Sequence, residues 1–61
     1  MPVDWEAEVR ALLVLDRGSA HVEELAALVG LGVSEALVVL AELELDGWVE
    51  QRPGLRFEHA S

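Results

Sequence analysis

Apolar residues at helical spacing predict a first helix over residues 5–17. Four positions recur at short intervals and are expected to form its buried stripe: Trp5, Val9, Leu12 and Leu13. We expect Asp4 to cap the start of this helix and Gly18 to end it. Aspartate is a favoured N-cap, and glycine accepts the left-handed backbone that often follows a helix.

Two more helices are predicted, and a glycine-containing connection joins them. The first covers residues 23–29, follows a minor strand at residues 20–22 and ends at Gly30; its inward residues are expected to be Leu25, Leu28 and Val29. The second covers residues 35–46, with Ser34 as its N-cap and Gly47 as its end. Spacings of four and three residues place one set on the face toward the other helices: Ala36, Leu40, Leu43 and Gly47. Another set is expected on the outer side: Glu35, Val38, Val39, Glu42 and Asp46.

A β-hairpin is predicted at the C-terminal end of the chain. Residues 48–52 and 55–59 read as strands on either side of Pro53-Gly54, a turn dipeptide. Aromatic residues with apolar neighbours are expected to anchor the core: Trp5, Trp48 and Phe57. The predicted fold is therefore mainly α with a small β-hairpin, a winged helix-turn-helix of three helices and a two- or three-stranded wing.

The composition indicates one small domain with more apolar surface than it can easily hide. Residues 1–61 suffice for a single domain, of which 52% are hydrophobic, with a mean hydropathy of +0.32. A partner surface is therefore expected. No uncharged run approaches the roughly 20 residues of a membrane span, and no signal-peptide pattern opens the sequence, so we expect a cytoplasmic protein.

The charge of the chain argues against nucleic-acid binding. Twelve acidic residues face four arginines and no lysine, which gives a formal net charge of -8. The whole excess lies in residues 1–46, whereas residues 47–61 are neutral. Affinity for nucleic acid comes largely from Lys and Arg that displace counterions from phosphates. We therefore expect weak or no direct DNA binding by the isolated domain.

The third predicted helix carries the main candidate site. A helix that reads a DNA groove needs Arg, Lys, Asn or Gln at exposed positions, and this helix offers carboxylates and apolar groups. One interpretation is that Glu35 and Glu42 form a solvated face. We favour another, a second apolar stripe that contacts another chain or domain. The candidate interface residues are Val38, Ala41, Glu42 and Leu45.

The predicted hairpin is the second candidate site. Arg52 and Arg56 could contact a phosphate backbone as the wing of such a fold often does. The alternative is cross-strand pairing with Glu50 and Glu58. We favour the pairing, because two arginines neutralise only about two phosphates.

Two parts of the chain resemble the C-terminal winged-helix domain of the bacterial DNA-processing family DprA, also called Smf. These are residues 43–50, Leu-Glu-Leu-Asp-Gly-Trp-Val-Glu, and residues 53–57, Pro-Gly-Leu-Arg-Phe. With residues 21–25 and 30–31 the resemblance covers residues 5–57. It implies an excised C-terminal domain of a larger protein that handles single-stranded DNA and loads RecA in natural transformation and recombination. It also implies an accessory role, with its own Rossmann-like domain, a second copy of the chain or a recombination protein such as RecA as partner.

No catalytic, cofactor or metal site is predicted, and no small-molecule substrate or membrane partner. His21 and His59 are far apart in a chain without cysteine, and no serine has an evident base partner. We therefore expect a non-enzymatic module that acts mainly through protein contacts. The alternative is a DNA-binding module, which would contact duplex or branched DNA through its wing or act as a small transcriptional regulator.

Overall fold

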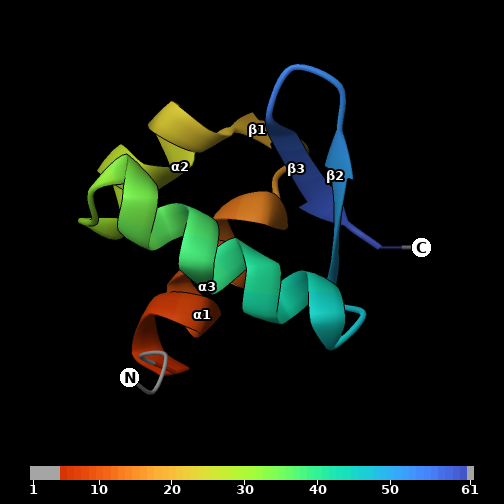
Figure 1. Cartoon of the computed structure of the whole chain (residues 1–61), viewed down its shortest axis with the longest axis horizontal. Coiled ribbons are helices and arrows are strands. Elements are labelled where there is room, and N and C mark those ends of the chain that lie inside the picture. The colour runs from red at the N-terminus through yellow and green to blue at the C-terminus, as the bar shows by residue number, and fades with distance from the viewer. Residues whose placement is uncertain (1–4, 61) are drawn as a thin grey trace.

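The computed structural model describes residues 5–60, which form three helices and a three-stranded sheet (Figure 1). The helices are α1 (Trp5–Leu15), α2 (Val22–Val29) and α3 (Val33–Leu45). The strands are β1 (Ala20–His21), β2 (Val49–Arg52) and β3 (Arg56–His59). The predicted order of helices, minor strand and hairpin is confirmed.

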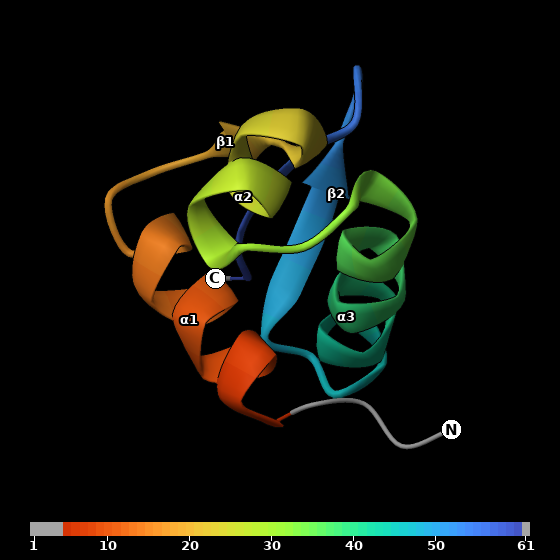
Figure 2. The same ribbon diagram turned by 90° about the vertical axis from the view of Figure 1, so that its left-hand side faces the viewer.

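The sheet is antiparallel, with β3 between β1 and β2. Phe57 pairs with Ala20 on one side and with Gln51 on the other, so the hairpin is joined to the start of α2 through β1. The three helices contact one another, and Figure 2 shows α2 next to α1 and α3 lying alongside β2. α2 and α3 meet at an angle of 99°. This angle is within the range of a helix-turn-helix corner.

The core is built from apolar residues of all three helices and all three strands. Its largest fully buried side chains are Phe57, Leu25, Leu40 and Val22. The expected inward face of α3 is confirmed for Ala36, Leu40 and Leu43, whereas Gly47 lies after the end of the helix and is exposed. No polar or charged residue is buried among residues 5–60, so the core is held together by apolar packing.

The predicted buried stripe of α1 is wrong. Trp5, Val9 and Leu13 are exposed, Trp5 at 69% and Leu13 at 64%, and Leu12 is only partly buried. The helix instead buries three residues spaced by four: Ala7, Ala11 and Leu15. Alanines let the backbone of α1 approach its neighbours closely. The helix is apolar on two faces, and the close approach buries the face with the smaller side chains.

Three other burial expectations also fail. Leu28 of α2 is 58% exposed, whereas Leu25 and Val29 are buried as expected. Val39 of α3 was expected on the outer side and is only 6% exposed, because α3 packs against α1, α2 and β2 and so buries a wide face. Among the aromatic residues only Phe57 anchors the core. Trp48 lies before β2 and Trp5 opens α1, and both rings are mostly exposed.

The N-cap of α3 differs from the one expected, and α2 has a side-chain cap that was not predicted. α2 is capped by His21, whose Nδ1 accepts a hydrogen bond from the Glu23 backbone N–H at 3.1 Å. α3 begins at Val33 with Gly32 as N-cap, so Ser34 lies inside the helix. There the Glu35 carboxylate accepts a hydrogen bond from the Gly32 N–H at 3.2 Å. The expected cap Asp4 lies outside the described residues.

The ends of the helices and the turn of the hairpin follow the glycines as expected. Gly30 after α2 and Gly47 after α3 have φ of 85° and 82°, a conformation that glycine adopts without a Cβ clash. In the turn of the hairpin, Gly54 has φ of 82° and Leu55 has φ of 59°. The Leu55 carbonyl accepts a hydrogen bond from the Val22 N–H at 2.9 Å, which ties the turn of the hairpin to the start of α2.

Candidate protein-interaction face on α3

The outer side of α3 presents a row of exposed apolar residues along the whole helix. Residues at four-residue spacing lie almost above one another on a helix. Four apolar residues of α3 follow this spacing, and Val38 lies beside them. We call these five residues the α3 outer face: Val33, Leu37, Val38, Ala41 and Leu45. Leu45 is 83% exposed and Val38 is 57% exposed. A surface this apolar on a small domain is typical of a contact site.

The candidate residues from the sequence lie together on or beside this surface. Val38, Ala41 and Leu45 belong to the α3 outer face, and Glu42 is exposed one turn after Val38. The sequence interpretation missed Val33 and Leu37. The signal was present, because the four-residue spacing from Leu45 to Ala41 continues back to both of them.

Carboxylates border the α3 outer face. Four acidic residues of α3 and its C-cap are exposed: Glu35, Glu42, Glu44 and Asp46. The helix contains no Arg, Lys or His. Glu35 caps the helix through Gly32, whereas Glu42, Glu44 and Asp46 form no ion pair within residues 5–60. The face is therefore both apolar and negatively charged.

The outer face of the hairpin holds its arginines in contacts within the chain. Glu50 is opposite Glu58 and Arg52 is opposite Arg56, so these four side chains share one side of the sheet. Arg52 Nε donates to Glu58 Oε1 at 2.8 Å, and Arg52 Nη2 lies 3.6 Å from Glu50 Oε2. This hydrogen bond lowers the pKa of Glu58 and raises that of Arg52. The expected cross-strand pairing is thus present at Arg52.

Arg56 has a different partner from the one expected. Its Nη2 donates to the Ser19 hydroxyl at 3.1 Å and to the Ser19 carbonyl at 3.2 Å, so it pairs with neither Glu50 nor Glu58. Ser19 precedes β1, which pairs with β3 and so brings the two residues together. Both arginines of the hairpin therefore already have partners, and a phosphate would have to compete with these contacts.

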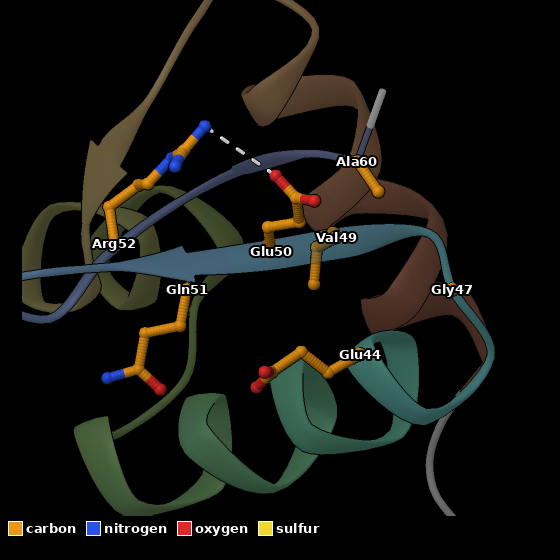
Figure 3. A pocket seen from close by; sticks show the side chains of 7 residues that line it. All are labelled: Glu44, Gly47, Val49, Glu50, Gln51, Arg52 and Ala60. Atoms are coloured by element: carbon orange, nitrogen blue, oxygen red, sulfur yellow. Dashed lines mark ion pairs between the residues drawn. The ribbon is translucent and has the colours of Figure 1, made fainter.

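An open groove of about 530 Å³ separates the C-terminal half of α3 from β2 (Figure 3). Figure 3 shows Glu44 projecting from α3 and Gln51 from β2 toward the same space, with Arg52 directed to Glu50 on the other side of the strand. The groove is polar, and its nearest cation is already paired. It brings together no nucleophile and base.

The two histidines have structural contacts. His21 caps α2, and His59 Nε2 donates to the Leu12 carbonyl at 2.8 Å, which ties β3 to α1. Within residues 5–60 no three His, Cys, Asp or Glu side chains come close enough to hold a metal ion. No single helix in this range is long and apolar enough to cross a membrane, and only the bent pair of α2 and α3 meets that criterion when the two are taken together.

The α2–α3 corner, the hairpin after α3 and the small sheet define a winged helix-turn-helix. The family of DprA winged helix domains matches residues 4–55, which is most of the chain. The chain therefore belongs to the DprA winged-helix family. Domains of this family are generally non-catalytic. No curated protein and no solved structure shows significant similarity to the chain.

Proposed function

We propose that this DprA-type winged-helix domain acts as a protein-docking module of a cytoplasmic DNA-processing protein. Its partner would be its own Rossmann-like domain, a second copy of the chain or a recombination protein such as RecA. The observation that carries this proposal is the α3 outer face, which is apolar and acidic in the position where a DNA-reading helix needs donors. In the full protein the module would support single-stranded DNA handling and RecA loading in natural transformation.

The electrostatics of the wing support the same proposal. A wing that holds DNA needs cations that are free to meet phosphates. Arg52 is bound by Glu58, and Arg56 is bound by Ser19. The chain also carries a net charge of -8, which repels a polyanion before contact. In the rival function, a wing that binds duplex or branched DNA, phosphates would compete with the Glu58 carboxylate for Arg52, whereas Arg56 keeps its charge beside the neutral Ser19.

The docking test uses a double variant, Val38→Lys with Leu45→Lys, in sedimentation equilibrium over a range of concentrations. The domain is run alone, with a DprA-type Rossmann-like domain and with RecA. Any association of the wild type should weaken in this variant, because lysines cannot be buried in an apolar contact without a partner charge. The control is Leu13→Lys with Leu28→Lys, which makes the same charge change at exposed leucines on α1 and α2. Association that is equal in the variant and the wild type would refute docking through α3.

The DNA test separates the rival function. Fluorescence anisotropy of a labelled duplex and a labelled single strand at low salt should show no binding by the wild type. Binding that falls with added salt, and is lost in Arg52→Ala, would place the function on the wing instead.

A further inference from the structure

We propose that the α3 outer face takes a basic amphipathic segment of a partner protein, and that it does not pair with a second copy of this chain. This inference rests on the docking function proposed above and specifies the chemistry of the partner. The observations that carry it are the apolar row, the carboxylates that border it and the positions of the four arginines.

The length and spacing of the apolar row fit the apolar stripe of an amphipathic helix. Val33 and Leu45 are twelve residues apart, which on a helix is about 18 Å, or a little over three turns. Ala41 is the small member between Leu37 and Leu45, and it leaves room for a large side chain of the partner. A partner helix with apolar residues at i, i+3, i+4 and i+7 spans such a row.

The charges beside this row are of one sign. Glu35, Glu42 and Asp46 are spaced by seven and four residues, so they lie along one border of the face. Glu44 lies on the other side, at the groove opposite Gln51 (Figure 3). The apolar row is therefore bordered by carboxylates on both sides.

Within residues 5–60 no arginine forms an ion pair with these carboxylates. On the hairpin, Arg52 is bound by Glu58, and Arg56 is bound by Ser19, which precedes β1. Arg10 is on α1 and Arg17 is in the turn that follows it. The compensating cations must therefore come from the partner, and a segment with Lys or Arg beside its apolar stripe supplies them.

A second copy of the chain is the wrong occupant for the same reason. Two α3 helices that met face to face would bring the four carboxylates of one copy toward the same four of the other, without a cation between them. Like charges that meet across an interface disfavour the complex, whereas opposite charges also speed the encounter. A basic segment gains from both effects, and its binding should weaken as salt rises.

The experiment compares two fluorescently labelled helical peptides of about 18 residues with the same leucine stripe, one flanked by lysines and one by glutamates. Anisotropy titrations with the 61-residue domain should show at least about tenfold tighter binding of the lysine-flanked peptide. That binding should weaken with salt and be lost in the Val38→Lys, Leu45→Lys variant. A triple variant, Glu42→Gln, Glu44→Gln and Asp46→Asn, should also weaken it.

The matched control for the triple variant is Glu8→Gln, Asp16→Asn and Glu24→Gln. It removes the same number and kinds of charge from α1, the following turn and α2. If the control variant weakens binding of the lysine-flanked peptide as much as the α3 triple variant does, only the net charge of the domain matters and the proposal is overturned. Circular dichroism of each variant confirms that the helices remain folded.

Failure of this inference can be told from failure of the docking function. If both peptides bind equally and the α3 double variant abolishes their binding, the face is a docking site without a charge preference, and only the further inference fails. A self-association that the α3 double variant abolishes would make a second copy the occupant, again with docking intact. If neither peptide binds and no association changes in the double variant, both proposals fail.

Discussion

The orientation of α1 leads to a paired prediction at Leu13 and Ala11. Leu13 is expected inside from its spacing in the sequence, but it is 64% exposed, whereas Ala11 is 1% exposed against the core. We expect Leu13→Ala to be nearly neutral and Ala11→Leu to be destabilising. One substitution replaces leucine by alanine and the other replaces alanine by leucine, at positions two residues apart on one helix.

The magnitudes follow from burial. Full burial of a leucine contributes about 1.5–3 kcal/mol, and about a third of Leu13 is covered, so its truncation should cost less than about 1 kcal/mol. Helix propensity offsets part of this loss, because alanine is the better helix former. A leucine at position 11 must push packed elements apart and should cost about 1–3 kcal/mol. A domain of 61 residues has a stability of about 3–9 kcal/mol, so the two results are easily distinguished.

The assay is urea unfolding followed by helical circular dichroism, with Leu40→Ala as a reference. Leu40 is fully buried, and its truncation should cost about 2–5 kcal/mol. The orientation of α1 is refuted if Leu13→Ala lowers the free energy of unfolding by more than about 2 kcal/mol, the range of a buried leucine, or if Ala11→Leu leaves the unfolding midpoint unchanged.

Three smaller predictions concern the wing and the caps. Because the hydrogen bond from Arg52 lowers the pKa of Glu58 below the usual 4.5, this pair stabilises the fold above that pH and the contribution is lost as acid protonates the carboxylate. The stability difference between the wild type and Glu58→Gln in urea should therefore shrink between pH 7 and pH 3, and a difference independent of pH would contradict the pairing. His21→Ala should cost about 0.5–2 kcal/mol as a lost N-cap, and His21→Asn should restore most of it in the same assay; equal losses in both would rule out capping as the role of this ring. Gly54→Ala should lower the thermal midpoint by an amount equivalent to about 1 kcal/mol, because φ of 82° strains any residue with a Cβ, and an unchanged midpoint would show that the turn adjusts.

The arrangement of elements was readable from the sequence because its signals are local. Gly30 and Gly47 end helices because glycine adopts a positive φ without a Cβ clash, and the dipeptide Pro53-Gly54 favours a turn through its own backbone preferences. The absence of a cation on α3 is likewise a property of the sequence alone. These signals also predicted most of the α3 outer face, since Val38, Ala41 and Leu45 follow helical spacing.

The residues of α1 do not by themselves show which face of the helix is buried. The helix is apolar both at Trp5, Val9 and Leu13 and around Ala7 and Ala11, so its periodicity permits two orientations. Which one is buried depends on the surfaces of α2, α3 and β3 against which α1 packs. The exposure of Trp5 follows from that choice.

The sequence by itself therefore determined the winged-helix order of elements, their glycine ends and an acidic, apolar third helix. Only the tertiary structure decided which side of α1 faces the core and which partner Arg56 of the wing takes. Arg56 reaches Ser19 across 37 positions of sequence, and His59 reaches the Leu12 carbonyl across 47. Such contacts depend on the pairing of β3 with β1 and on the packing of α1, and local patterns carry no information about residues so far apart.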